Sequence, residues 1–560
     1  MTMTGSSLLS LAVLAAAAAL AFMPAAGAMC AESAPAVLNS SILQGYVETF
    51  NRHDNELYSN AFPNAKAMAF LKGNVPLLDC PDEDIRRTYY FRWWTYRKHV
   101  KQTSDGYVVT EFLPQVPWSG KYNAINCPAG HHFHEGRWIH EAKYLSDYAV
   151  FWFRKGGSVR AYSFWAADAI YAMYLVQMNK ALVTDLLDDL VKNYKGWEQS
   201  RLVSDGLFWQ IDDRDGMEVS VGKSGKRATI NSYMYGDAKA IARIAELAGK
   251  ADVAKEYQAK ADKLRELVEQ KLWDPRAKFF KTLPRSPSEL VPYAGKARQP
   301  NDRRDGKDPA LVDVRELHGF TPWYFNLPEP GKGYEVAWKQ LMDPNGFYAP
   351  YGPTTAERRH PGFKLSYEGH ACQWNGPSWP LSTAVTLTAM ANVLNDYPQD
   401  AITKADYLQM LRIYAHSQQR KLDDGTVVPW IDENVNPLTG DWIARTMLLA
   451  EEKRRKEQGK PAGPVERGKD YNHSSFCDLV ITGLVGLRPR ADDVVEVNPL
   501  VPEGKWDFFC LDDVLYHGKV LTIIWDKTGA KYGKGAGLTV LANGKQIAHS
   551  PKLGKLTGKL

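Results

Sequence analysis

Cysteine is scarce in this sequence. The 560 residues include only six cysteines, which are widely spaced and form no CxxC pair. Their scarcity excludes a disulfide-stapled scaffold, and their spacing excludes a zinc-finger type of module. We expect mainly buried free thiols, although export would permit one disulfide among Cys30, Cys80, Cys127, Cys372, Cys477 and Cys510.

Strong net charge and internal apolar runs are also missing. The formal charge is +5, and the lysines and arginines are scattered rather than gathered beside an RNA- or DNA-binding motif. A nucleic-acid partner is therefore not expected. After the first 31 residues, no segment is long and apolar enough to span a membrane, and no short-period sequence repeat is present.

The one long apolar run lies at the start of the chain. "LLSLAVLAAAAALAFM" is followed by the small residues of "PAAGAMCA", which is typical of a secretory signal peptide cut after Ala28 or Ala31. The run has no preceding Lys or Arg, so a retained anchor stays an alternative. We expect residues 1–31 to be a leader and the mature protein to be periplasmic or secreted, without stable membrane insertion.

Helical periodicity dominates the middle of the chain. Apolar residues recur at intervals of three and four over 163–197, 231–249, 252–273, 377–397, 404–422 and 473–487. Long polar and aromatic loops separate these segments at 205–230, 274–312, 343–376 and 423–441. Helical hairpins joined by long loops predict a mainly α fold, an (α/α)6 toroid whose loops gather at one end and build a pocket.

The pattern changes near residue 490. Runs rich in β-branched and aromatic residues alternate with Gly, Asn and Asp turns, and "NGK" at 543–545 is typical of a hairpin. We therefore expect three regions after the leader. An extension of loops and short helices (32–130) opens the helical domain, which ends at 489, and a small antiparallel β-domain spans 490–560.

An ordered series of motifs resembles a known family. "GME", "NSYMYGDAKAIARIAELAG", "LHGFTPWYFNLP", "WNGPSWP", "ENVNPLTGD" and "YNHSSFCDLVITGLVGL" follow one another along the chain. Together they resemble the mannosylglycerate hydrolase-like and glycoside hydrolase family 63 group of (α/α)6 glycosidases, near trehalases and glucoamylases, over about 160–487. This resemblance implies inverting hydrolysis by two carboxyl groups that stand roughly 6.5–9.5 Å apart.

The resemblance places the proton donor in the acidic loop "DGLFWQIDDRDGMEVSVG" (205–222). Relatives carry "E-S-G-L-D-N-S-P", whose glycine matches Gly216 and whose acid matches Glu218, with Glu in place of Asp. Apolar neighbours would raise the pKa of Glu218 by desolvation. Asp215 remains the alternative acid. "DDRDG" also hints at structural calcium, but Lys223 stands where an EF-hand loop needs Glu.

The resemblance places the general base in "WIDENVNPLTGD". A family Glu precedes "P-x-T-G" and matches Glu433, with Asp432 as the alternative. The candidate sugar-binding residues are polar or aromatic side chains near these motifs, each of which could instead serve the core or cap a helix. They are Trp118, His134, Arg214, Asn231, Tyr235, Trp374, Asn375, Trp379 and His473.

Two other polar clusters carry weaker hypotheses. "GHHFHEGRWIHE" (130–141) contains His131, His132, His134 and Glu135, which are too closely spaced for an HExxH zinc site. No metal or other cofactor is expected there. Arg92 and Arg97 lie among tryptophans and would suit an anionic sugar, or they could pack on those rings.

The sequence thus predicts an inverting glycoside hydrolase, exo-acting on an α-linked glycoside, with Glu218 as acid and Glu433 as base. A polysaccharide lyase using Tyr471, Asn472 and His473 is one alternative, because lyases also use α/α toroids. A non-catalytic carbohydrate-binding protein is another.

Overall fold

The computed structural model of the chain describes residues 36–58, 60–286, 289, 309–422, 424–461, 463 and 466–560. The expected signal peptide (1–31) lies outside these ranges. Within them, no helix combines the length and apolar character needed to cross a bilayer. The five cysteines in this part of the chain are free thiols, and all except Cys372 are buried, as expected.

The inner layer of the helical part is a closed ring. Successive members pack on one another. The last returns to the first because the Glu135 carboxylate accepts hydrogen bonds of 2.8–3.2 Å from the backbone N–H groups of Phe476, Cys477 and Asp478. The members are α4 (Ala129–Gly136), α6 (Ala166–Gln177), α9 (Ala228–Leu247), α11 (Thr321–Tyr324), α12 (Pro380–Asp396) and the π-helix η7 (Leu479–Leu484).

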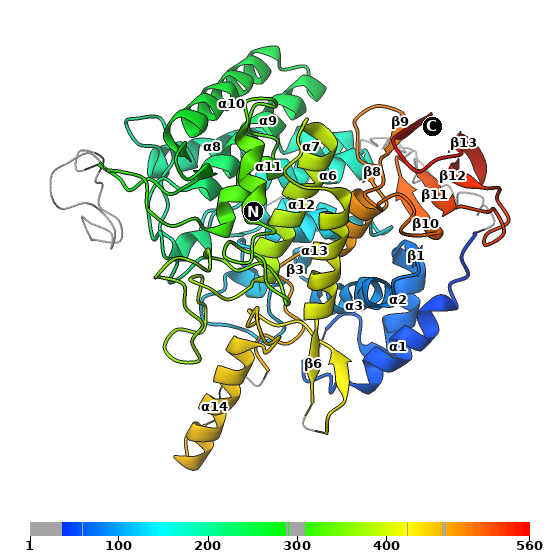
Figure 1. Cartoon of the computed structure of the whole chain (residues 1–560), viewed down its shortest axis with the longest axis horizontal. Helices are drawn as coiled ribbons and strands as arrows, with labels where there is room; N and C mark the ends of the chain where they lie inside the picture. The colour runs from blue at the N-terminus through cyan, green and yellow to red at the C-terminus, as the bar shows by residue number, and fades with distance from the viewer. Residues whose placement is uncertain are drawn as a thin grey trace, which may run out of the picture. The chain divides into compact units, whose positions relative to one another are not determined.

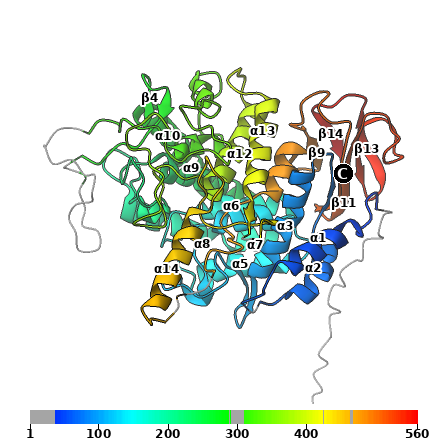
Figure 2. The same ribbon diagram turned by 60° about the horizontal axis from the view of Figure 1, so that its bottom comes forward.

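An outer layer packs on this ring and completes the expected (α/α)6 toroid. The hairpin of α9 and α10 is visible in Figures 1 and 2, where the two helices lie side by side. One inner member, α11, is a single turn. Trp323 of α11 packs on Trp338 of the outer helix η6, with the ring centroids 5.7 Å apart. The outer members are α3 (Glu83–His99), α5 (Lys143–Arg154), α8 (Leu187–Arg201), α10 (Ala251–Lys271), η6 (Tyr334–Gln340) and α13 (Lys404–Ser417).

Local sequence explains where these helices begin and end. The expected pair at 231–249 and 252–273 is confirmed as α9 and α10, which meet at Gly249 with φ +71°. The segment 163–197, where helical periodicity was expected, folds into three helices, because Met178 adopts a left-handed φ of 55° after α6. Asn179 then starts α7 (Lys180–Asp185) by accepting a hydrogen bond from the Leu182 N–H at 3.2 Å.

The C-terminal β region includes a strand that the sequence did not indicate. β1 (Leu77–Asp79) pairs antiparallel with β10, and the sheet order is β1-β10-β11-β12-β13. The expected hairpin is confirmed, with Asn543 and Gly544 at φ 48° and 76° between β12 and β13. The other strands of this region are β8 (Leu487–Arg488), β9 (Val494–Val497), β10 (Phe508–Tyr516), β11 (Lys519–Asp526), β12 (Gly537–Ala542), β13 (Lys545–Ser550) and β14 (Leu556–Lys559).

The region 32–130, where loops and short helices were expected, also contains the 17-residue helix α3. α1 (Ile42–Arg52) and α2 (Ala67–Asn74) pack on the long helix α3. α14 (Ile443–Glu457) has no buried residue after Arg445 and projects from the fold in Figures 1 and 2. Short two-stranded ribbons complete the described elements: β2 (Val100–Thr103) with β3 (Gly106–Val109), β4 (Trp273–Asp274) with β5 (Phe279–Phe280), and β6 (Gln419–Lys421) with β7 (Val427–Pro429).

Candidate functional site

A cavity of about 480 Å³ joins loops that are far apart in sequence. Its volume lies within the range of small-molecule sites in proteins. Both expected catalytic carboxyl groups, Glu218 and Glu433, line it. The full lining is Glu111, Phe112, Trp118, Ile125, Cys127, Tyr162, Asp213, Arg214, Gly216, Glu218, Gly369, His370, Ala371, Cys372, Trp379, Glu433, Arg467, Tyr471 and His473.

The acidic loop presents Glu218 to this cavity through an unusual backbone path. Gly216 has φ +72°, and a Cβ there would come within 2.5 Å of the Cys127 sulfur, so only glycine fits. Val219 has φ 63°, which is strained for a β-branched residue. Between them, the Glu218 carbonyl accepts a hydrogen bond from the Trp374 N–H at 3.0 Å. Strain of this kind is concentrated at functional sites in proteins.

Burial raises the pKa of Glu218 to about 8. The negative charges of Asp213 and Glu433 act in the same direction, because a second negative charge nearby disfavours ionisation. Glu218 therefore keeps its proton at neutral pH, as a proton donor must.

The alternative acid, Asp215, does not line the cavity. Its carboxylate accepts a hydrogen bond of 2.8 Å from Arg227 and another from the Thr229 hydroxyl, and the Asp215 and Arg227 side chains are completely buried. Asp212 accepts hydrogen bonds from the hydroxyls of Ser220 and Ser224. Asp212 and Asp215 therefore hold the loop in shape, whereas Asp213 and Glu218 are the acids of this loop that line the cavity.

Glu433 lines the cavity and is paired with a cation. Arg467 donates two hydrogen bonds to its Oε1, at 2.9 and 3.2 Å, and the Cys372 thiol lies 3.4 Å from Oε2. The neighbouring Asp432 is instead paired with Arg445 at 2.8 Å, with both side chains 2% exposed. The two candidate bases thus have separate roles, since only Glu433 lines the cavity.

Glu111 also lines the cavity, although no motif in the sequence indicated it. Its Oε1 accepts a hydrogen bond of 2.7 Å from the Tyr471 hydroxyl and lies 3.3 Å from Nε2 of His473. Burial raises the pKa of Glu111 to about 8, and the charges of Glu433 and Glu218 add to this effect. "TEFLP" has no motif that distinguishes this glutamate, so no local signal could have identified it.

Four of the candidate sugar-binding residues line the cavity: Trp118, Arg214, Trp379 and His473. Trp118 is 47% exposed and has the Arg467 guanidinium over its ring at 5.4 Å. Trp374 lies behind the lining, stacked on Trp379 with ring centroids 4.6 Å apart. It therefore supports a cavity wall rather than forming one.

The other candidates lie elsewhere, in structural roles. Asn231 binds both the N–H and the carbonyl of Phe208 at 2.8 Å, and the Tyr235 hydroxyl donates to the Asn326 carbonyl. Asn375 is outside the lining; its backbone carbonyl accepts a hydrogen bond from the Lys364 N–H, and its side-chain Oδ1 is buried without a hydrogen-bond partner among the described residues. His134 lines a separate cavity of about 190 Å³, 3.5 Å from Asp168. Side-chain direction separates these residues from the cavity, and the motifs do not specify it.

The histidine-rich segment and the arginines of α3 are also used structurally. Glu135 caps the segment that leads into η7, and His132 bridges the Tyr148 hydroxyl and the Asn472 carbonyl. Arg92 donates to the Ser474 carbonyl, and Arg97 lies over the Trp94 ring at 5.1 Å. Across the described ranges, no group of three or more His, Cys, Asp or Glu side chains could hold a metal ion.

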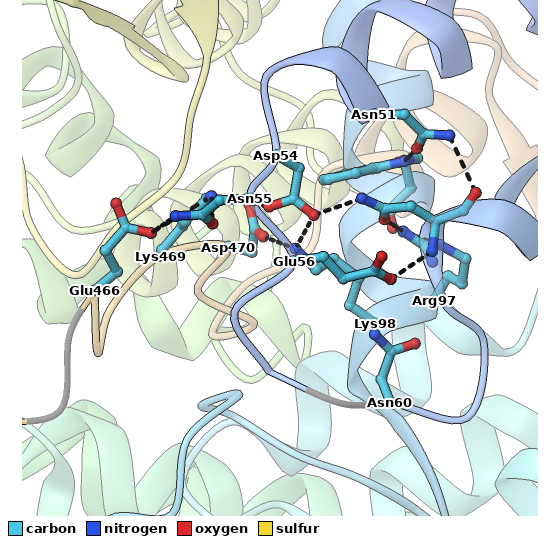
Figure 3. A network of polar contacts seen from close by, with 12 residues as sticks. Asn51, Asp54, Asn55, Glu56, Asn60, Arg97, Lys98, Glu466, Lys469 and Asp470 are labelled. Atoms are coloured by element: carbon cyan, nitrogen blue, oxygen red, sulfur yellow. Dashed lines mark hydrogen bonds and ion pairs between the residues drawn. The ribbon is translucent and has the colours of Figure 1, made fainter.

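The segment 466–473, here called the strap, carries three residues of the cavity lining, Arg467, Tyr471 and His473. A buried polar network holds it against the N-terminal region (Figure 3). Lys98 of α3 contacts both Asp54 and Asp470, and Lys469 binds the other oxygen of Asp54 at 2.8 Å. Residues before position 121 therefore position the strap.

Solved structures of several proteins are similar to this chain, at different levels of identity. A protein named Sialidase is 43% identical, with a TM-score of 0.81, over 93% of this chain and 45% of that protein. The chain thus spans less than half of that relative's length. The GH63 mannosylglycerate hydrolase from Thermus thermophilus is 12% identical over 64% of this chain and 98% of that one, with a TM-score of 0.44. The GH78 rhamnosidase of Bacillus sp. GL1 is 10% identical over 80% and 40%, with a TM-score of 0.49.

Two family descriptions match the chain itself. The C-terminal domain of glycosyl hydrolase family 65 matches residues 487–549, which are the β region. Residues 121–474 match the mannosylglycerate hydrolase MGH1-like glycoside hydrolase domain. That match covers more than half of the chain and includes both the acidic loop and the Glu433 loop. The chain therefore belongs to the family of MGH1-like glycoside hydrolase domains.

Proposed function

We propose that this protein is an inverting glycoside hydrolase that acts on an α-linked glycoside. Glu218 is the general acid that protonates the leaving oxygen, and Glu433 is the general base that activates water. One observation supports this most directly: two carboxyl groups from distant loops meet in one cavity, in opposite electrostatic environments. Glu218 is buried beside the negative charge of Asp213, whereas Glu433 is paired with Arg467. Divergent environments of this kind separate acid from base.

The charges in the cavity favour a neutral sugar over a carboxylated one. Arg467 is engaged by Glu433 at 2.9 Å, and Arg214 lies 3.7 Å from Asp213. Each arginine that lines the cavity thus has a carboxylate neighbour. The long loops around the cavity favour exo action, in which the terminal sugar enters first.

The stereochemistry of the product tests the mechanism. We would screen aryl α-glycosides and α-linked disaccharides, and then follow the first-formed sugar by NMR. Release of the β-anomer is the expected result. Release of the α-anomer would contradict an inverting pair.

Substitution of each carboxyl group tests the assignments. Glu218→Gln and Glu433→Gln should each lower kcat by roughly 10²- to 10⁴-fold, because proton transfer in the transition state contributes about that much. Thermal unfolding would show whether each variant is folded. If both folded variants keep full turnover, the two roles are wrong.

We also propose that the reaction takes place outside the cytoplasm. It rests on the sequence of residues 1–31, which resembles a signal peptide. N-terminal sequencing of the protein recovered from the producing cells would test it. A mature chain that starts near residue 29 or 32 is expected, and an intact Met1 would contradict export.

A further inference from the structure

We propose that Glu111 recognises the substrate as a neutral hydrogen-bond donor, with its carboxyl O–H directed at a hydroxyl of the bound sugar. This inference rests on the proposed hydrolysis of a glycoside, since it assigns a role within the same cavity. It adds a recognition residue from outside the segment that matches the family, because Glu111 precedes residue 121.

The two side chains that contact the Glu111 carboxyl group, Tyr471 and His473, are neutral. The Tyr471 hydroxyl donates to Oε1, and His473 Nε2 lies near the same oxygen. Burial lowers the pKa of His473 to about 3, so the imidazole is neutral and its 3.3 Å contact with Glu111 is not an ion pair. Arg467, the nearby cation on the strap, is turned to Glu433. In the part of the chain that the structure describes, no Lys or Arg forms an ion pair with Glu111.

This environment holds the Glu111 carboxyl in its neutral form. A buried carboxyl group without a cationic partner keeps its proton, because an isolated buried charge is strongly disfavoured. The raised pKa of Glu111, about 8, agrees with this, since burial and the charges of Glu218 and Glu433 outweigh the opposing hydrogen bond from Tyr471. The titratable and charged groups around Glu111 are Glu218, Glu433, Arg467, Tyr471, His473, Cys127, Tyr148 and Tyr162.

The two carboxyl oxygens of Glu111 differ in what they contact. Both contacts of the carboxyl group are made to Oε1, and no other described residue hydrogen-bonds to it. Because Glu111 lines the cavity, Oε2 is the oxygen left for a ligand. An Oε2–H group can donate to a sugar hydroxyl oxygen, which an ionised carboxylate cannot do.

The test separates a neutral donor from a charged acceptor by pH. In the inactive Glu218→Gln background, calorimetry would measure binding of the aryl α-glycoside that the wild-type enzyme cleaves, from pH 6 to 9.5. We expect affinity to fall by roughly tenfold, the size of one lost hydrogen bond, as pH rises through the pKa of Glu111. That pKa should lie below about 8 in this background, because the Glu218 charge is absent. Adding Glu111→Gln, which keeps a donor but cannot ionise, should remove this fall. It should weaken binding at pH 7 by no more than about threefold.

A charged role for Glu111 would give the opposite pattern. Glu111→Gln would then abolish binding at pH 7, or leave the pH dependence as it was, and either result would overturn the proposal. Glu111→Ala in the same background should weaken binding by roughly tenfold at pH 7. Deoxy analogues of the glycoside would then identify the hydroxyl. The analogue that lacks the hydroxyl bound by Glu111 should bind equally well to the Glu218→Gln protein with and without Glu111→Ala.

A second measurement needs no ligand, so failure of the proposed function would not hide the answer. Infrared difference spectra between wild type and Glu111→Gln at pH 6.5 should show the carbonyl stretch of a protonated carboxyl group, which disappears above about pH 8. A carboxylate band at pH 6.5 would overturn the proposal. Absence of any glycoside binding together with the protonated band would instead count against the hydrolase assignment.

Discussion

Glu218 sets the high-pH limit of the proposed reaction. A general acid works only while protonated, and the pKa of Glu218 is raised to about 8 by burial and by Asp213 and Glu433. We therefore expect kcat to fall as pH rises through about 8. Asp213→Asn removes one negative neighbour, lowers the pKa of Glu218 and should move this limb to lower pH. Asp185→Asn, at an exposed position, is the matched control and should leave the fall of kcat at the same pH. If Asp213→Asn also leaves it at the same pH, the assignment is contradicted.

Glu111 also makes stability depend on pH. In the unfolded chain this carboxyl group ionises near its ordinary pKa of 4.5, whereas the folded protein holds the proton up to about 8. A pKa raised on folding stabilises the folded state fully below the ordinary value, and this contribution is lost as pH rises toward the folded-state value. The folded state should therefore lose stability between about pH 4.5 and 8.

Glu111→Gln should cancel this loss. Glutamine cannot ionise, so the variant should unfold like the wild type near pH 4.5 but gain roughly 2 to 4 kcal/mol in the free energy of unfolding at pH 8. Denaturant titrations at both pH values would measure the difference. Equal pH dependence of the two proteins would show that the Glu111 carboxyl is already ionised in the folded state.

Cavity residues could be predicted from the sequence where a motif indicated both a turn of the backbone and the acidic side chain that the turn presents. Gly216 fixes the turn that presents Glu218, and "NPLTG" follows Glu433 in a turn, so the resemblance carried both positions into one cavity. Prediction of cavity residues failed where the sequence offered only a suitable residue type and no motif that fixes the direction of the side chain. Asn231 and Tyr235 lie in the buried N-terminal half of the inner helix α9, and their direction depends on which neighbours surround that helix. Glu111 gave no signal because its role depends on Tyr471 and His473, more than three hundred residues away.

At the scale of elements, the strap depends on its buried ion pairs. Lys98 is 2% exposed and contacts Asp54 and Asp470, which are each 3% exposed. Lys98→Met would leave these carboxylates without that cation, which costs roughly 3–5 kcal/mol in comparable buried pairs. It should also lower kcat/KM, because Arg467 lies on the same strap. Denaturant unfolding and steady-state kinetics would measure both effects.

The control for this prediction is an exposed ion pair. Lys143 pairs with Asp147 at 2.6 Å, but the lysine side chain is 60% exposed. Lys143→Met should cost less than about 1 kcal/mol and leave kcat/KM unchanged. Lys98→Arg should restore part of the loss. Similar effects of Lys98→Met and Lys143→Met would mean that the buried network does not hold the strap.

Helices could be predicted where apolar residues recur at regular helical spacing over a long segment. α9, α10, α12 and α13 have such periods, and their residue ranges agree with the expected ones within a few positions. β1 has only three residues, all buried, and pairs with a strand more than four hundred residues later. No local pattern distinguishes a strand of that length, because its stability comes from its partner.

At the scale of the whole molecule, the N-terminal region completes both the sheet and the cavity. β1 is an edge strand of the C-terminal sheet, α3 anchors the strap, and Glu111 lines the cavity, although all three precede the family match at 121. A chain that begins at residue 121 would leave Asp470 and the β10 edge unpaired. We expect it to be insoluble or unfolded by circular dichroism and inactive. A chain that begins at residue 36 keeps every described element and should fold and turn over substrate like the mature protein. Cooperative unfolding and activity of the 121–560 chain would show that the N-terminal region is dispensable.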